Sequence, residues 1–242
     1  MTPARPLPVV AVVLAGRGGA RLEGTLAGLP PGSLVLDPAS RCTEGTLPPG
    51  FCRIGRPDAL AGLSATWLLL MQEGERLTPA LSEDIVRATA GTTASAYRVP
   101  LEVEAFGGHL RLPGAPVRLV RREHAHLALD RGLQLGFRME RQTPTLGGTL
   151  VVAAAPGLSD AVANLEADAA ALASLLFHCG RRPTLARMLG SPLAASARVA
   201  FARANRPLGW GRWILGVFAG YRTVVIWAKL WELRRTQLSV SA

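Results

Sequence analysis

Short apolar runs alternate with amphipathic stretches over residues 8–104. Five runs have the length and composition of strands, at residues 9–14, 33–37, 51–54, 66–71 and 96–101. Helical patterns lie between them at residues 18–27 and 79–90, the second opened by Thr78 as a cap and Pro79 in its first turn. This alternation predicts an α/β fold with a mostly parallel sheet.

The pattern changes in the second half of the chain. Residues 102–156 are rich in glycine, proline and arginine, with strand patterns at 116–120 and 148–155. Beyond Pro156 the chain becomes helical, and we expect helices at 159–179, capped by Ser159 and stopped by Gly180, at 184–204 and at 209–235. We therefore predict an α/β domain over residues 1–156 and a helical C-terminal extension over residues 157–242.

The predicted helix at 209–235 is amphipathic. Arg212, Arg222 and Lys229 fall together on one side, and the opposite face is apolar, with Trp213, Ile214, Val217, Phe218, Tyr221, Val224, Val225 and Trp231. The three charges interrupt the roughly 18 apolar residues that a membrane-spanning helix needs. We expect the helix to lie on an anionic membrane surface. The alternative is that its apolar face packs on the α/β domain.

Composition limits the classes of protein that fit. With 242 residues, 49% of them hydrophobic, the chain is long enough to bury a large core. The net charge is +10, and Lys229 is the single lysine. Arginine suits phosphate, so nucleic acid, anionic lipid and a nucleotide-sugar diphosphate are all compatible partners, although a general preference for arginine over lysine gives the same composition. Because no nucleic-acid-binding motif is present, we expect no nucleic-acid partner.

The cysteines and the N-terminus favour a cytoplasmic protein. Cys42, Cys52 and Cys179 are odd in number and have no CxxC spacing, which fits a reducing compartment. The apolar run near the N-terminus leads directly into a glycine-rich turn, so we interpret it as a first strand and not as a signal peptide.

The segment LAGRGGARLEG, residues 14–24, follows the first predicted strand and opens a helix. Backbone N–H groups in such a turn can bind a phosphate, although Arg21 occupies the place of the third glycine of a GxGxxG pattern. The segment is similar to the LAGG-x-G-x-R opening of sugar nucleotidyltransferases. Residues 22–29 have no lysine to bind a triphosphate, which counts against nucleotidyl transfer and leaves it a third candidate function.

Several further segments, in order along the chain, resemble family 2 glycosyltransferases. LVLDPASRCTEGT is similar to the family's I-V-V-D-S-x-S-x-D-G-T, and ATWLLLMQEGERLTPALSEDI to its D-W-V-L-x-L-D-A-D-E-x-L-T-P-E-L segment. YRVPLEVEAFGG and PVRLVRRE match two later stretches. GWGRWILGVFAGYRTVVIWAKLWELRR resembles the C-terminal segment of the subgroup that builds the lipopolysaccharide core.

This resemblance implies a GT-A-like fold that binds a nucleotide-sugar donor. The donor-binding positions would be Ala15, Gly16, Arg17 and Asp37. The implied reaction is an inverting transfer to a lipopolysaccharide or other lipid-linked saccharide, by a peripheral protein on the inner face of the cytoplasmic membrane.

Three arginines near residue 120 are candidates for binding the diphosphate leaving group. Arg118 and Arg122 point the same way if both lie in one strand, and Arg121 then points opposite. We therefore assign Arg118 and Arg122 to the donor site. The alternative is a solvated strand edge that discourages pairing with another strand.

The family's metal-binding DxD motif is not intact in this chain. Gln72, Glu73, Gly74 and Glu75 stand in its place. A divalent cation such as Mg²⁺ or Mn²⁺ prefers oxygen ligands, which Glu73 and Glu75 would supply. The alternative is that both are solvated turn residues.

The subgroup's His-Glu pair is also missing in that order. Glu123, His124, His126 and Asp130 lie in its neighbourhood. A base that deprotonates a sugar hydroxyl must reach the acceptor, and we predict Asp130 first and Glu123 second for this role, with a surface charge as the alternative. Two main functions follow: glycosyl transfer, or a catalytically inactive GT-A-like binding or scaffolding protein at the membrane.

Overall fold

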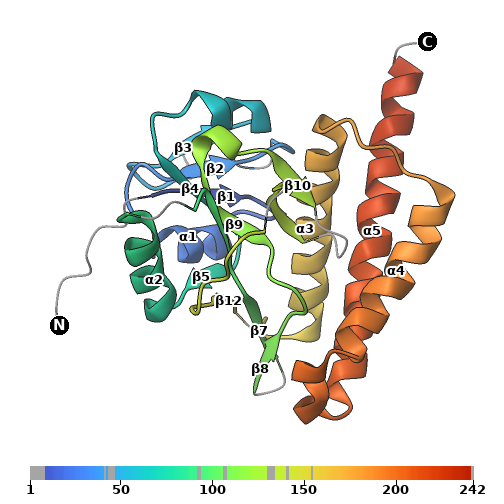
Figure 1. The fold of residues 1–242 in the computed structure, drawn as a ribbon. Helices are drawn as coiled ribbons and strands as arrows, with labels where there is room; N and C mark the ends of the chain where they lie inside the picture. The colour runs from blue at the N-terminus through green and yellow to red at the C-terminus, as the bar shows by residue number, and fades with distance from the viewer. Residues whose placement is uncertain are drawn as a thin grey trace.

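A six-stranded sheet forms the centre of the molecule, with strand order β3-β2-β1-β4-β9-β6 (Figure 1). The computed structural model describes residues 9–40, 42, 47–91, 94–105, 108–129, 134–139, 142–153 and 155–240. The strands are β1 (Val10–Leu14), β2 (Leu34–Leu36), β3 (Cys52–Ile54), β4 (Trp67–Gln72), β6 (Ala96–Arg98) and β9 (Val117–Arg121). Strand β9 runs antiparallel to β4 and β6, and the other pairings are parallel. The prediction of an α/β fold with a mostly parallel sheet is confirmed.

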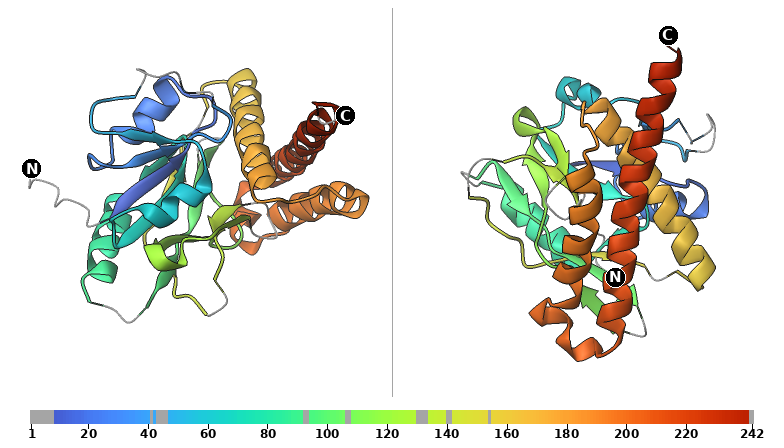
Figure 2. Two further views of the ribbon diagram at one scale, coloured as in Figure 1. Left: turned by 90° about the horizontal axis from the view of Figure 1, so that it is seen from above. Right: turned by 90° about the vertical axis from the view of Figure 1, so that its right-hand side faces the viewer.

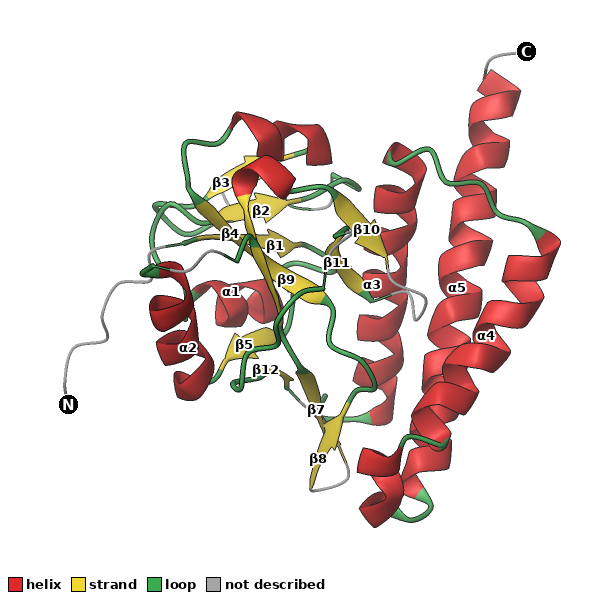
Figure 3. Cartoon of the chain, in the orientation of Figure 1, coloured by secondary structure: helices red, strands yellow, loops and turns green. Residues whose placement is uncertain are grey.

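Helices cover both faces of this sheet (Figure 3). Helices α1 (Ala20–Leu26) and α2 (Pro79–Thr89) pack on one face, where Ala11 and Val13 of β1 point. Helix α3 (Leu158–His178) packs on the other, against Val12 and Leu14. Burial on both faces explains why these strands are continuous apolar runs and not alternating ones.

A second, four-stranded sheet follows the order β5-β12-β7-β8. Its strands are β5 (Glu75–Leu77), β12 (Leu150–Val152), β7 (Leu101–Ala105) and β8 (Gly108–Arg111), and a separate hairpin joins β10 (Leu127–Leu129) to β11 (Leu135–Phe137). The prediction of one strand over residues 96–101 was wrong. Pro100, which has no N–H to donate, separates β6 from β7, and the two belong to different sheets.

The cap predicted at Thr78 is present, Thr184 caps α4 (Leu185–Ala200) without having been predicted as a cap, and the cap predicted at Ser159 is absent. Thr78 accepts a hydrogen bond from the Leu81 N–H at 3.2 Å, and Thr184 accepts one from Arg187 at 3.4 Å. The Ser159 cap prediction was wrong, because α3 begins at Leu158 with Gly157 as its N-cap. The short helices η1 (Pro57–Gly62), η2 (Arg122–His124) and η3 (Arg203–Leu208) complete the structure.

The C-terminal helices form successive layers beside the sheet. Helix α5 (Gly211–Val240) lies between α3 and α4 (Leu185–Ala200), as the right-hand view of Figure 2 shows. Helices α4 and α5 approach closely at Gly220, where a side chain would clash with Ser196. The Trp227 indole N–H of α5 donates a hydrogen bond to Ser191 of α4 at 2.7 Å. The predicted C-terminal helices are therefore present.

Over residues 211–237, helix α5 is long enough and, in its most apolar part, apolar enough to cross a bilayer. The expectation that this helix does not span a bilayer stays a prediction, because Arg222 and Lys229 interrupt the apolar stretch over residues 213–230. However, about a third of this stretch is buried against the rest of the protein.

The three cysteines should differ sharply in reactivity. Cys42 is buried, and burial together with the adjacent Asp37 carboxylate raises the pKa of its thiol to about 11. Cys52 and Cys179 are exposed. Because the thiolate is the reactive form, we expect a thiol reagent at neutral pH to label Cys52 in the folded protein, Cys179 more slowly because burial raises the pKa of its thiol, and Cys42 only after denaturation. Rapid labelling of Cys42 in the native state, read by peptide mass spectrometry, would contradict this arrangement.

Candidate functional site

The carboxyl ends of β1, β2 and β4 meet at one edge of the central sheet. The loops that follow them carry Ala15–Gly16–Arg17, Asp37 and the Gln72–Glu75 turn, respectively. In open α/β sheets this edge is where ligands bind. Six of the predicted site residues therefore lie at this edge. Their positions directly after predicted parallel strands are the reason that they share it.

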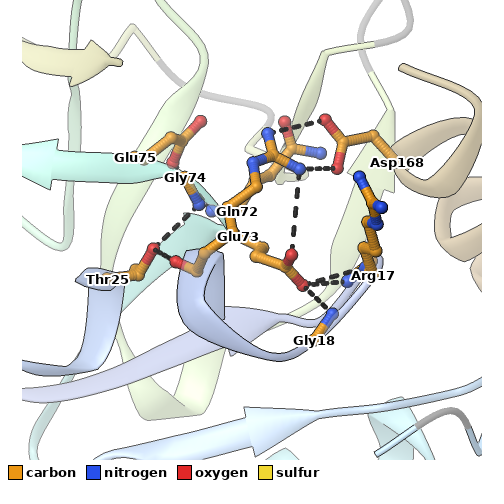
Figure 4. A network of polar contacts seen from close by, with 10 residues as sticks. Arg17, Gly18, Thr25, Gln72, Glu73, Gly74, Glu75 and Asp168 are labelled. Atoms are coloured by element: carbon orange, nitrogen blue, oxygen red, sulfur yellow. Dashed lines mark hydrogen bonds and ion pairs between the residues drawn. The ribbon is translucent and has the colours of Figure 1, made fainter. Parts of the chain in front are cut away.

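The Glu73 carboxylate fills the backbone cradle that follows β1. Its Oε2 atom accepts hydrogen bonds from the N–H groups of Gly16, Arg17 and Gly18 at 2.7, 3.0 and 2.9 Å (Figure 4). The Glu73 side chain is fully buried. Successive N–H groups of this kind form an anion site, and here the anion is supplied by the protein itself. A ligand phosphate at this position would have to displace Glu73.

Arg21 lies across the same turn. Its guanidinium donates two hydrogen bonds to Asp168 of α3, at 2.7 and 3.1 Å, and approaches Glu73 at 3.9 Å. A Cβ atom on Gly74, whose φ is +87°, would lie 2.5 Å from the Arg21 Nε atom. Gly74 stands at the second aspartate of the family motif, so this arginine occupies space that an aspartate side chain would need.

Glycine also allows the helix α3 to approach the loop. A Cβ atom on Gly16 would lie 2.8 Å from the Asp168 Oδ1 atom. In addition, the Gly74 N–H donates to the Thr25 hydroxyl at 2.8 Å, which ties the turn to α1. The result is a polar network in which Glu73 and Asp168 each accept hydrogen bonds from the protein, while the Glu73 Oε1 atom is buried without one.

Glu75 and Arg118 form a buried ion pair. The Arg118 Nη2 atom lies 2.9 Å from Glu75 Oε1, and the two side chains are 0% and 2% exposed. Glu75 also accepts a hydrogen bond from the Gln72 N–H at 2.7 Å. Burial raises the pKa of Glu75, while the charge of Arg118 and the Gln72 N–H act in the opposite direction. The prediction placed Arg118 at a diphosphate, and the structure places it on this carboxylate.

Asp37 is fully buried beside β3. It accepts a hydrogen bond from the Cys42 N–H at 2.8 Å and pairs with Arg53 Nε at 3.3 Å. The Asp37 carboxylate is thus held by groups of the protein, and the nucleotide contact at this residue stays a prediction.

Arg122 and Glu123 do not join this group. Strand β9 ends at Arg121, and Arg122 begins η2 beside Thr66, at the opposite edge of the sheet, where its guanidinium donates to the Ala61 carbonyl. Because Arg122 lies outside the strand, the prediction that its side chain points the same way as that of Arg118 does not apply. Glu123 lies with Arg122 and is exposed beside His124. Asp130 lies outside the described residues.

Glu73 and Glu75 are poorly arranged for a shared metal ion. Their carboxylates turn to different partners, the loop N–H groups for Glu73 and Arg118 for Glu75. A divalent cation between them would have to displace the contacts of Glu75, whereas the Glu73 Oε1 atom is buried without a hydrogen bond. Within the described part of the chain, no three His, Cys, Asp or Glu side chains gather as a metal site.

A cavity of about 550 Å³ adjoins the network. Arg21, Gln72, Glu75 and Asp168 line it next to the network, and its other polar lining residues are Glu104, Gln134, Asn164, Arg198 and Arg222. The remainder lies between the second sheet and the three C-terminal helices, with mostly apolar side chains that include Leu101, Val103, Val152, Leu165, Leu215 and Phe218. Its volume lies within the range of about 300–1,000 Å³ that is typical of small-molecule sites. An amphiphilic molecule matches this lining better than a fully charged one.

Comparison with known proteins finds a distant structural likeness. No protein-family model matches the chain, and no curated protein matches it. Among solved structures, the chain is similar to the crystal structure of S. aureus TarS 1-349 in complex with UDP, with a TM-score of 0.36 and 9% identity over 94% of this chain and 92% of that one. The mixed α/β sheet and C-terminal helices of this protein are consistent with a GT-A-like glycosyltransferase fold. A likeness this distant assigns no substrate.

Sequence reasoning missed two residues of the network. Arg21 lies within the glycine-rich segment but was considered only as a replacement for glycine. Asp168 lies 147 residues further along the chain, in the middle of a helix with no local signal of function. Its one sequence trait is a charge among the alanines of a largely buried helix, which is a reason to search for a partner.

Proposed function

We propose that this protein is a glycosyltransferase-like binding protein that does not transfer sugar. The observation that carries this proposal is the Glu73 carboxylate, which occupies three N–H groups of the loop after β1. The buried pair of Glu75 with Arg118 supports it, since the second acidic group of the turn is also held by the protein. A sugar diphosphate would compete with both arrangements.

The ligand of this binding protein is an amphiphilic saccharide, such as a lipid-linked intermediate of the cell envelope. The apolar walls of the cavity suit a hydrocarbon chain, and burial of each CH₂ group contributes about 0.8 kcal/mol. Arg21, Gln72 and Asp168, which line the cavity, offer hydrogen-bond donors and acceptors to the hydroxyl groups of a saccharide.

Metal-independent transfer is the second candidate, and the position of Arg21 favours it. Its guanidinium fills space next to Gly74, where the family places a metal-binding aspartate, so a fixed cation would take the place of the metal. The bidentate pair with Asp168 neutralises that cation, which is why we rank binding above transfer.

Calorimetric titration separates the two functions. We expect no saturable heat with UDP-sugars or GDP-sugars, with or without Mn²⁺, and no release of UDP or GDP. We expect dodecyl maltoside, kept below its critical micelle concentration as a probe for alkyl saccharides, to bind one molecule per protein. The substitution Ala161→Phe fills part of the cavity and should weaken this binding by at least about 10-fold, while Ala80→Phe, on exposed α2, should not.

Two results would overturn the binding proposal. Release of nucleotide in the presence of a chelator would establish metal-independent transfer instead. Equal binding of dodecyl maltoside by the Ala161→Phe and Ala80→Phe variants would show that the cavity is not the site.

A further inference from the structure

We propose that α4, η3 and α5 form a docking surface for an anionic lipid bilayer, on which the protein lies without crossing it. The charge of the chain is the first argument. Residues 180–242 carry eleven arginine and lysine residues and one acidic residue, Glu232, whereas residues 1–179 carry sixteen of each sign. The entire net charge of +10 therefore belongs to this part of the chain.

The exposed apolar side chains are concentrated in the same segment. Among the described residues, eleven of the twelve large hydrophobic side chains that are exposed belong to it. They are Leu185, Leu189, Leu193, Phe201, Trp210, Trp213, Ile214, Val217, Tyr221, Val224 and Trp231. The rings of Phe201 and Trp213 meet edge to face with centroids 5.3 Å apart, which joins the α4 side to the α5 side.

Large exposed apolar patches on soluble proteins mark interaction sites. Aromatic and aliphatic side chains combined with arginine are the composition of helices that lie in the headgroup region of a bilayer. Tryptophan and tyrosine favour that region because one end of the ring system is apolar and the other is polar. Trp210, which is 84% exposed, is the most accessible of these side chains.

The packing of α5 favours docking over spanning. Its exposed side chains Trp213, Val217 and Val224 lie on one face, while Ile226 and Leu230 on the other are fully buried in the core beneath α3 and α4. A spanning orientation would strip α5 from both helices and expose that core. Docking in the plane of the membrane leaves the packing intact.

Charge also favours a bilayer over a second copy of the chain as the occupant. Two copies that met through this surface would bring the two +10 segments together, and like charges disfavour such an interface. An anionic leaflet supplies the opposite sign.

Sedimentation with vesicles tests the proposal. We expect the full chain to bind vesicles of equal parts phosphatidylcholine and phosphatidylglycerol at least about 10-fold more tightly than vesicles of phosphatidylcholine alone, with release as NaCl is raised. The double variant Arg187→Gln/Arg235→Gln should lose on the order of 10-fold in partitioning. The double variant Arg76→Gln/Arg87→Gln is the matched control, because it removes the same charge from exposed positions on β5 and α2 and should bind as the wild type does.

A second pair of substitutions tests the apolar contribution. Leu189→Gln/Leu193→Gln changes side chains that are 71% and 73% exposed, so the fold should persist, and binding should fall by at least about 10-fold. Equal binding to neutral and anionic vesicles, or equal losses in the two arginine variants, would overturn the proposal. Retention through high salt and alkaline carbonate would replace docking with spanning, and a dimer with no vesicle binding would assign the surface to a second copy.

Discussion

Replacement of Glu75 by glutamine is expected to lower the free energy of unfolding by about 3–5 kcal/mol. The substitution keeps the size of the side chain but leaves Arg118 as a fully buried charge without its carboxylate. A guanidinium keeps its proton in proteins, so it cannot become neutral to reduce the cost of burial. Urea unfolding at neutral pH, followed by circular dichroism, measures the loss.

The reverse substitution should behave differently with pH. Arg118→Met leaves Glu75 buried, and this carboxyl group can bind a proton, because burial already raises its pKa and loss of Arg118 raises it further. A folded-state pKa above the unfolded value gives stability that is present at low pH and lost as pH rises through the folded pKa. Relative to wild type, we therefore expect Arg118→Met to be clearly more destabilised at about pH 8 than at about pH 5.

An exposed ion pair provides the matched control for both variants. Asp84 and Arg87 lie 2.9 Å apart on α2, but the Arg87 side chain is 74% exposed. Arg87→Met should change stability by less than about 1 kcal/mol. The double variant Glu75→Met/Arg118→Met should be more stable than either single variant, because no buried charge remains. Losses of similar size in Glu75→Gln and Arg87→Met would contradict the importance of the buried pair.

The central sheet could be predicted because buried parallel strands leave a strong signal. The runs at residues 9–14 and 66–71 are apolar throughout, and β1 and β4 lie within one residue of their predicted ends. The second sheet left a weaker signal. Strand β5 is three residues long and begins at Glu75, which the sequence places in a polar turn, and its pairing with β12 is fixed by contacts that are distant along the chain.

The candidate site was predicted in position but not in its contacts. Asp37, Glu73 and Glu75 follow parallel strands, and parallel strands end at one edge, so their shared location follows from the fold class. Which atoms they meet depends on tertiary packing. The sequence gives no reason for Glu73 to turn toward the N–H groups of Gly16 and Gly18, or for α3 to bring Asp168 to Arg21.

Substitution of Glu73 by alanine should destabilise the protein and create an empty anion site. Three loop N–H groups lose their common acceptor, and an unsatisfied buried donor costs about 1–3 kcal/mol, so we expect a loss of at least about 3 kcal/mol. Acetate resembles the removed carboxylate and should bind the vacated cradle. Because a ligand that binds only the folded state stabilises it, thermal unfolding of Glu73→Ala should shift upward with acetate concentration.

Glu73→Gln separates the charge of this side chain from its shape. The amide oxygen still accepts hydrogen bonds and the cradle remains filled, so the variant should be less destabilised than Glu73→Ala and should not respond to acetate. Sodium chloride at equal ionic strength controls for screening. If acetate stabilises wild type and Glu73→Ala equally, the loop N–H groups do not form an anion site. The proposal that Glu73 takes the place of a ligand phosphate would then lose its physical basis, since these N–H groups would bind no anion even without the Glu73 carboxylate.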